Sequence, residues 1–117
     1  MKLALSLAGL ALGLTLTSAR ADINIGVIVS ATGPAASLGI SEKNTFALMP
    51  TTIAGQKVNY LVLDDASNPG EASKNARRLT SESKVDVIIG WTTTPSSRAV
   101  LEVAAETKTP LLVMAPT

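Results

Sequence analysis

Residues 85–97 read VDVIIGWTTTPSS. The stretch from Val85 to Gly90 is mostly apolar, which is typical of a strand that is covered on both faces of a parallel sheet. It is followed by Trp91, three threonines and Pro95, and proline is common in the first turn of a helix. We therefore predict a buried strand that leads directly into a helix whose start is rich in hydroxyl side chains.

Thr92, Thr93 and Thr94 stand at the expected start of this helix. A helix N-terminus presents unpaired backbone N–H groups and about half a positive charge, so hydroxyl groups there suit a carboxylate or another small anion. Two interpretations stay open: a ligand site, or a helix cap at Thr94 with two solvated threonines beside it. Charge-assisted hydrogen bonds of roughly 1.5 to 3 kcal/mol each could supply much of a micromolar affinity of about 8 kcal/mol.

The segments on either side of this stretch alternate in the same way between strand and helix. Strands are expected at residues 23–30, 57–63 and 85–90 and from Pro110 onward, and helices at 39–49, at 69–83 and from Pro95 onward. Short connections between such elements predict parallel strands with right-handed crossovers. The fold class is therefore α/β with a parallel, doubly wound sheet, in which ligands bind beyond the carboxyl ends of the strands.

Two further segments lie at expected strand ends. The small, turn-rich stretch of residues 31–39 follows the first strand and is a second candidate ligand segment. Asp64 and Asp65 end the second strand, where turn and cap hydrogen bonds explain them, although an acid/base or metal-binding pair in an exported enzyme is a weaker alternative. Trp91 either forms the wall of a pocket or covers the edge of the sheet.

Residues 1–21 have the pattern of a secretory signal peptide. Lys2 is followed by an apolar run at residues 3–16, and Ala19, Arg20 and Ala21 form a small-x-small cleavage site. The apolar run is shorter than an ordinary membrane span. We expect export and cleavage, after which residues 22–117 form a soluble domain that does not insert into the membrane.

Charge and composition argue against several classes of function. Removal of Lys2 and Arg20 leaves 8 of the 10 basic residues against 9 acidic ones, and only 3% of the residues are aromatic, which argues against a nucleic-acid surface. The chain contains no cysteine and no histidine, so thiolate catalysis and the commonest general base are absent. We therefore predict a binding protein rather than an enzyme, with no cofactor and no metal.

Several motifs follow one another in a characteristic order: Ile25-Gly26-Val27, Thr32-Gly33-Pro34, Asp64-Asp65 and the strand Val85–Gly90. In this order they resemble the periplasmic solute-binding proteins of branched-chain amino-acid-type ABC transporters, which have the type I periplasmic binding fold. The resemblance covers nearly all of residues 22–117. It implies a periplasmic protein, of which this chain is an N-terminal fragment that contains part of the first of two lobes.

The resemblance also implies site residues and partners. The ligand would be a small carboxylate, held between the lobes, and the complete protein would dock on a membrane ABC permease. Thr94 matches a serine or threonine that binds the carboxylate, and Leu38 matches a position that is often aromatic in amino-acid binders. The implied ligand contacts are Leu38, Thr92, Thr93, Thr94 and Thr117, the last at the start of a second contact loop.

The identity of the ligand stays open at this point. Leu38 and the short segment at residues 39–55 differ from the pattern of amino-acid binders. The loop at residues 92–97 and the shortened helix are similar to relatives that take aromatic or other organic acids. The function has an alternative as well, because an extracellular ligand-sensing domain of a receptor or regulator can use the same fold. A membrane span or a signalling module further along the chain would distinguish the two.

Overall fold

The computed structural model describes residues 20–115. The predicted signal peptide lies outside the described residues except for Arg20 and Ala21, and Thr117 also lies outside them. Between residues 20 and 115, no helix is both long enough and apolar enough to cross a membrane.

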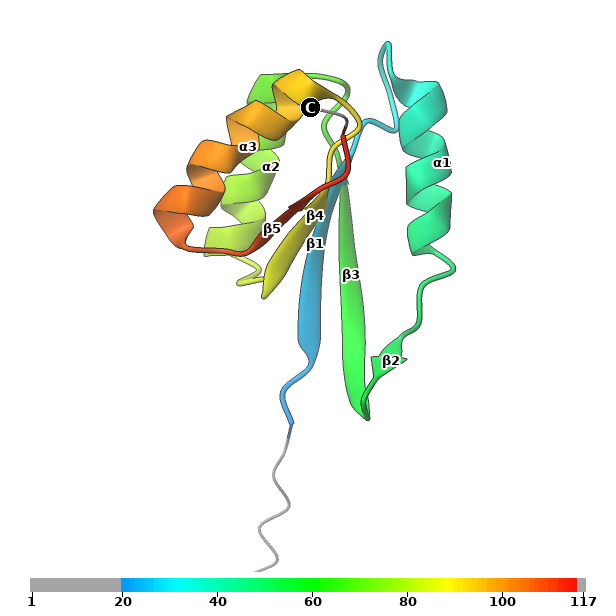
Figure 1. Cartoon of the computed structure of the whole chain (residues 1–117), viewed down its shortest axis with the longest axis vertical. Helices are drawn as coiled ribbons and strands as arrows, with labels where there is room; N and C mark the ends of the chain where they lie inside the picture. Colours follow the sequence, from blue (N-terminus) through cyan, green and yellow to red (C-terminus); the bar gives the residue numbers. More distant parts are fainter. Residues whose placement is uncertain (1–19, 116–117) are drawn as a thin grey trace, which may run out of the picture.

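Strands and helices alternate along the described residues as the sequence predicts, apart from the short strand β2 directly before β3 (Figure 1). Helix α1 begins and ends earlier than expected, β4 begins at Val87 rather than Val85, and β5 begins one residue after Pro110. The elements are β1 (Ile23–Val29), α1 (Ala36–Phe46), β2 (Thr52–Ile53), β3 (Gln56–Asp64), α2 (Pro69–Ser81), β4 (Val87–Gly90), α3 (Thr94–Thr107) and β5 (Leu111–Val113).

The strands form one sheet in the order β2-β3-β1-β4-β5. Strand β1 lies in the middle and pairs in parallel with both β3 and β4, and β4 pairs in parallel with β5. Strand β2 was not predicted; it has two residues and pairs antiparallel with β3. The tight hairpin turn that joins β2 to β3 places Ala54 and Gly55 at positive φ, as turns between right-twisted strands require.

The helices cover both faces of the sheet, which confirms the doubly wound α/β arrangement (Figure 1). Helices α2 and α3 lie side by side on one face, where Ile28 and Ile88 pack with Leu79 and Val100. Helix α1 lies on the other face, where Phe46 packs with Val27 and its neighbours in β1 and β3. The fold thus has two apolar layers, one on each side of β1.

The contact of helix α2 with the sheet depends on small side chains. Ala72, Ala76 and Leu79 form its buried face, because residues four and seven positions apart lie on one side of a helix. Asn68 accepts hydrogen bonds from the backbone of Gly70 and Glu71 and thereby caps this helix. The helix is therefore fixed at its start by a polar cap and along its length by close packing.

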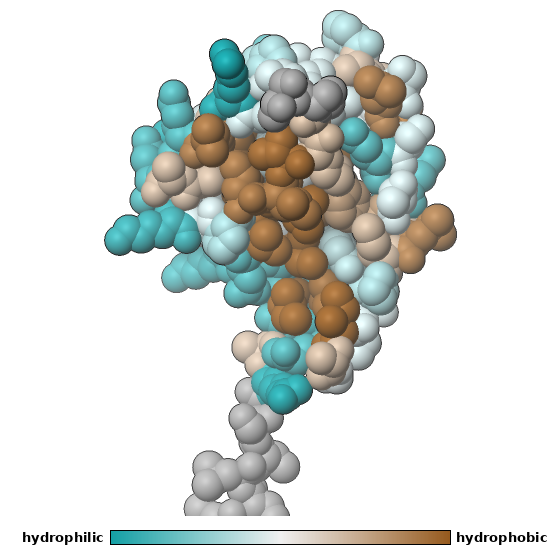
Figure 2. All heavy atoms as spheres, in the orientation of Figure 1, coloured by the Kyte–Doolittle hydropathy of each residue, from teal (hydrophilic) through white to brown (hydrophobic). Residues whose placement is uncertain are grey.

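Strand β5 is the edge of the sheet and carries exposed apolar side chains on both faces. Leu112 is 56% exposed and Leu101, on the neighbouring helix α3, is 57% exposed. Figure 2 shows the apolar side chains gathered over β5 and the adjoining part of the sheet. Within the described residues this edge of β5 pairs with no further strand.

Helix α1 approaches the end of β1 most closely at Gly39. A Cβ atom on Gly39 would lie 2.0 Å from the carbonyl oxygen of Ser30, which is closer than any real contact. We expect Gly39→Ala to force the helix away from the sheet and to lower the free energy of unfolding by about 1 to 3 kcal/mol, the usual cost of overpacking. Urea unfolding of the complete protein measures this change.

The matched control for this prediction is Ser37→Ala, an exposed position on the same helix. We expect it to leave the stability unchanged within about 0.5 kcal/mol, as is usual for surface substitutions. Equal stability of Gly39→Ala and the unmodified protein would contradict the close approach of α1 to Ser30.

Candidate functional site

The carboxyl ends of three strands meet at one end of the sheet. The chain passes from β1 to β3 on one side and then crosses back to β4 on the other side of β1. This reversal makes the ends of β1 and β4 the switch point of the sheet, where open α/β sheets have a crevice for ligands. The loops that follow β1, β3 and β4 all lie at this end (Figure 1).

The loop after β4 begins with a sharp change of backbone direction. Gly90 has φ of 139°, and a Cβ atom on it would lie 2.1 Å from the carbonyl oxygen of Ile28. The next residue, Trp91, donates its backbone N–H to the same oxygen at 2.8 Å and has φ of 73°, in the left-handed region. Only glycine fits at position 90, because a side chain there would collide with β1.

Trp91 turns into the core instead of facing an open pocket. Its side chain is fully buried among residues of α2 and α3, including Ala72 and Val100. Full burial contradicts the interpretation of Trp91 as the wall of an open pocket. The reversed backbone at positions 90 and 91 directs the indole ring beneath the helices.

Thr92 uses its hydroxyl group inside the protein. The oxygen accepts the backbone N–H of Ser30 at 2.8 Å and donates its proton to Glu42 Oε2 at 2.6 Å. The residue is only 7% exposed. Thr92 therefore joins the end of β1, the end of β4 and helix α1.

Thr93 and Thr94 form the start of helix α3. Thr93 is the last extended residue, with φ of −126° and ψ of 145°, and its carbonyl oxygen accepts the Ser97 N–H at 3.1 Å. The prediction of Thr94 as the cap is wrong by one position, because Thr94 already has helical geometry. No hydrogen bond from the Thr93 side chain caps the helix, and Thr94 is exposed at its N-terminus.

Leu38 lies in the first turn of α1, at the same end of the sheet as the threonines (Figure 1). Its side chain is 60% exposed. The structure thus brings four of the five predicted contact residues, Leu38 and Thr92 to Thr94, to one end of the sheet. The fifth, Thr117, lies outside the described residues.

Asp64 and Asp65 both hold loops rather than forming an acid/base pair. Asp65 is fully buried, and its Oδ1 accepts the Ser30 hydroxyl at 2.6 Å and the Ser67 N–H at 2.8 Å. Asp64 is exposed, and its Oδ2 accepts the Thr32 hydroxyl at 2.6 Å. Across residues 20–115 no three His, Cys, Asp or Glu side chains gather to hold a metal ion.

Sequence reasoning missed Ser30 and Glu42 at this site. The sequence offered a signal for Ser30, because it is the first polar side chain after an apolar strand. In the structure it is fully buried and hydrogen-bonded to Asp65 and Thr92. Glu42 had none, since a glutamate in a helix is usually a solvated surface residue. Its contact with Thr92 crosses 50 positions of the chain.

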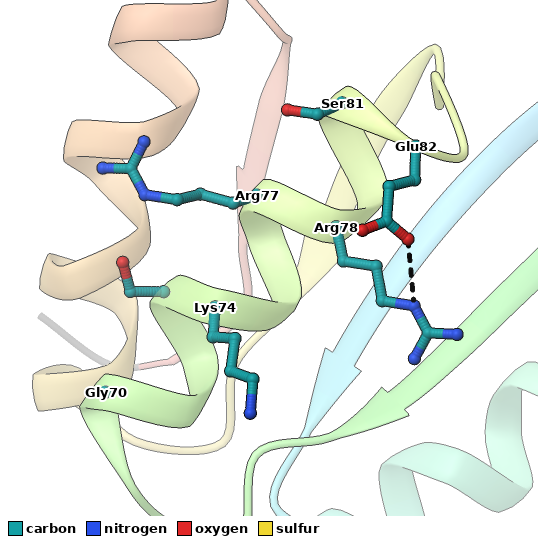
Figure 3. A pocket seen from close by; sticks show the side chains of 7 residues that line it. Gly70, Lys74, Arg77, Arg78, Ser81 and Glu82 are labelled. Atoms are coloured by element: carbon teal, nitrogen blue, oxygen red, sulfur yellow. Dashed lines mark ion pairs between the residues drawn. The ribbon is translucent and has the colours of Figure 1, made fainter.

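A surface groove lies elsewhere, on the outer surface of α2 (Figure 3). It has a volume of about 500 Å³ and is lined by Lys74, Arg77 and Arg78. Each cation is paired with a carboxylate, at 3.6 Å from Glu71, 2.8 Å from Glu106 and 3.6 Å from Glu82, respectively. This surface therefore offers no uncompensated positive charge, and the strand ends remain the candidate site.

A parallel, doubly wound sheet with hydroxyl groups at its switch point defines an α/β lobe of the kind that binds small ligands. The model of the periplasmic binding protein family matches residues 22–117. The chain belongs to this family. Among curated proteins, none matches it significantly.

Solved structures agree with this assignment. An extracellular ligand-binding receptor from Rhodopseudomonas palustris HaA2 is 50% identical, with a TM-score of 0.81 over 84% of this chain and 27% of that protein. An ABC-transporter solute-binding protein from Rhodopseudomonas palustris BisB5, in complex with 3,4-dihydroxybenzoic acid, is 35% identical, with a TM-score of 0.76 over 80% of this chain and 27% of that one.

A third solved structure is a leucine-binding protein from Thermotoga maritima. It is 32% identical, with a TM-score of 0.73 over 81% of this chain and 28% of that protein. The chain therefore spans only about a quarter of the length of these relatives. They confirm the type I periplasmic binding fold for the part of it that this chain contains.

Asp64 links the loops after β1 and β3 and gives this end of the sheet a pH dependence. Burial raises the pKa of its carboxyl group, but hydrogen bonds from the Thr32 hydroxyl and from the backbone of Ala66, Thr32 and Ala31 together outweigh this, so the pKa lies below its ordinary value. A lowered pKa stabilises the folded state above the unfolded-state pKa, and this contribution is lost as the pH falls through the folded-state value.

We expect Asp64→Asn to lower the free energy of unfolding at pH 7, and the difference from the unmodified protein to shrink as the pH falls below about 4. Urea unfolding of the complete protein over this pH range measures the difference. The control is Glu102→Gln, an exposed carboxylate on α3, for which the difference should stay small at every pH. A difference for Asp64→Asn that grows in acid would contradict the sign of the shift.

Proposed function

We propose that residues 22–117 form the first part of the N-terminal lobe of an extracytoplasmic solute-binding protein of an ABC importer. The complete protein captures a small carboxylate between this lobe and a second one. The observation that carries this proposal is the hydroxyl-rich N-terminus of α3 at the switch point of the sheet. Membership of the periplasmic binding protein family supports it.

The carboxylate binds at the start of α3 in this proposal. Thr93 and Thr94 supply hydroxyl groups there, and a helix N-terminus presents backbone N–H groups that suit an anion, although Pro95 carries none. The positive end of the helix dipole adds to the attraction. Thr92 fixes the loop, Leu38 contacts the rest of the ligand, and Thr117 begins a second contact loop.

The ligand is an amino acid or an aromatic or other organic acid. Both classes are named among the solved relatives, one in complex with 3,4-dihydroxybenzoic acid and one named as leucine-binding. The two ligands share a carboxylate, which is the group that the start of α3 suits. Their remaining parts differ, so the ligand class depends on residues around the carboxylate.

Residues 1–21 act as the signal peptide in this proposal, and the mature protein works in the periplasm. It docks on a membrane ABC permease, which takes over the ligand. The lobe binds and releases its ligand unchanged, because the two aspartates at the strand ends hold loops and are not paired for acid/base chemistry. It requires no cofactor.

A receptor role is the second candidate. The 50% identical relative is named an extracellular ligand-binding receptor, which favours a ligand-sensing domain as much as a transport protein. The ligand site is the same in both proposals. Deletion of the gene distinguishes them, because loss of uptake of a carboxylate supports transport and loss of a transcriptional or motile response with uptake intact supports sensing.

The first prediction of this proposal concerns the second lobe. We expect residues 22–117 alone to bind leucine and 3,4-dihydroxybenzoate no more tightly than millimolar, because one wall of the cleft leaves most of the ligand in water. The complete protein should bind one of the two ligands at micromolar concentration or better. Isothermal titration calorimetry of both forms is the measurement, and micromolar binding by residues 22–117 alone would contradict the two-lobed site.

The second prediction concerns Thr94. We expect Thr94→Val in the complete protein to weaken binding of the carboxylate ligand by roughly 1 to 3 kcal/mol, because a hydrogen bond to a charged group is lost. The control is Thr107→Val, which changes the same residue type at the opposite end of α3. Equal calorimetric affinities for Thr94→Val and the unmodified protein would exclude Thr94 as a ligand contact.

A further inference from the structure

Glu42 connects two segments of the proposed site, because it belongs to helix α1 and contacts Thr92 in the loop after β4. It follows Leu38 by four positions in α1, so the two side chains share one face of the helix. Its Oε2 accepts the hydroxyl proton of Thr92 at 2.6 Å. A carboxylate therefore stands beside the loop that follows β4.

The contact with Glu42 determines whether the Thr92 hydroxyl group can donate a hydrogen bond to a ligand or only accept one. A hydroxyl group has one proton to donate and two lone pairs that accept. The proton of Thr92 is directed to Glu42, and one lone pair accepts the Ser30 N–H at 2.8 Å. Only an acceptor position remains, so this hydroxyl cannot donate to a ligand carboxylate while Glu42 holds its proton.

Glu42 itself has further capacity to accept hydrogen bonds. Within residues 20–115 its Oε1 accepts no hydrogen bond and the carboxylate forms no ion pair, although the side chain is half-buried. It borders a groove of about 150 Å³ whose other walls are largely apolar, including Phe46, Met49 and Met114. A partly desolvated carboxylate in such a place favours a partner that donates hydrogen bonds or carries positive charge.

We propose that Glu42 is a specificity-determining residue of the ligand site. With Thr92 it forms an acceptor-only position that binds a hydrogen-bond donor on the ligand, either an ammonium or a hydroxyl group. The start of α3 has the opposite polarity and takes the carboxylate. The ligand class is then a carboxylic acid that also carries a hydrogen-bond donor; this inference rests on the proposed function.

The alternative is that Glu42 acts only as a structural support for Thr92. In that case its removal would loosen the loop and lower the affinity for every ligand equally. A selective role instead predicts that removal of the Glu42 carboxylate lowers the affinity only for ligands that carry the hydrogen-bond donor. Comparison of matched ligands separates the two.

The experiment uses two ligand pairs on the complete protein, measured by isothermal titration calorimetry. One pair is 3,4-dihydroxybenzoate and benzoate, and the other is leucine and 4-methylpentanoate, which lacks the ammonium group. In the unmodified protein we expect one pair to bind, with the donor-bearing member at least tenfold tighter. The pair that binds tells whether the donor is a hydroxyl or an ammonium group.

The variants are Glu42→Leu and Glu42→Gln, with Glu102→Leu on α3 as a control for the loss of one negative charge. Glu42→Leu should lower the affinity for the donor-bearing ligand at least tenfold. The affinity for the ligand without the donor should stay within about twofold of that of the unmodified protein. Glu42→Gln keeps an oxygen that can accept the Thr92 proton, so the loop is retained and only the charge is lost. We expect an intermediate loss for the donor-bearing ligand and the unmodified affinity for its partner.

Three outcomes would overturn this inference. If Glu42→Leu weakens both members of a pair equally while Glu42→Gln restores both, Glu42 is only a support for Thr92, and the proposed function stands. If the unmodified protein binds benzoate or 4-methylpentanoate as tightly as its partner, the acceptor position is not used. Binding of none of the four probes would instead contradict the proposed function, and the inference would fail with it.

Discussion

The close approach of Gly90 to β1 is the constraint on which the rest of this end of the sheet depends. The carbonyl oxygen of Ile28 accepts the Trp91 N–H at 2.8 Å and leaves no room for a Cβ atom at position 90. Trp91 therefore enters the left-handed region, and its ring passes beneath α2 and α3. Thr92 then lies against Ser30, and α3 begins beside the ends of β1 and β4.

The sequence was sufficient to predict the parallel strands and the three helices, because their signals are local. Continuous apolar runs mark the strands, and Pro69 and Pro95 mark the first turns of α2 and α3. The ends of α1 were less predictable, since only Gly39 and Phe46 are buried along this helix and little periodicity results. Strand β2 is too short to leave a pattern, and it exists because the following turn folds it back on β3.

The sequence could predict those features of the candidate site that depend on neighbouring residues in the chain. Hydroxyl side chains at a helix start can be read from residues 92–97, and the parallel sheet brings strand ends together. The sequence could not indicate which hydroxyls are already used, because that depends on contacts of distant segments. Thr92 meets Ser30 across 62 positions, and Asp65 meets Ser30 across 35. Three adjacent threonines that look equivalent in the sequence therefore differ in burial in the structure.

These long-range contacts have a consequence for how the lobe folds. Ser30 is held by Asp65 and by Thr92, and each of these hydrogen bonds closes a long loop whose entropy must be overcome first. The central strand β1 has the same requirement, because both of its partners lie far along the chain. Helices form from local contacts, whereas such non-local pairings form slowly. We therefore expect the strand ends around Ser30 to be among the last parts of the lobe to form.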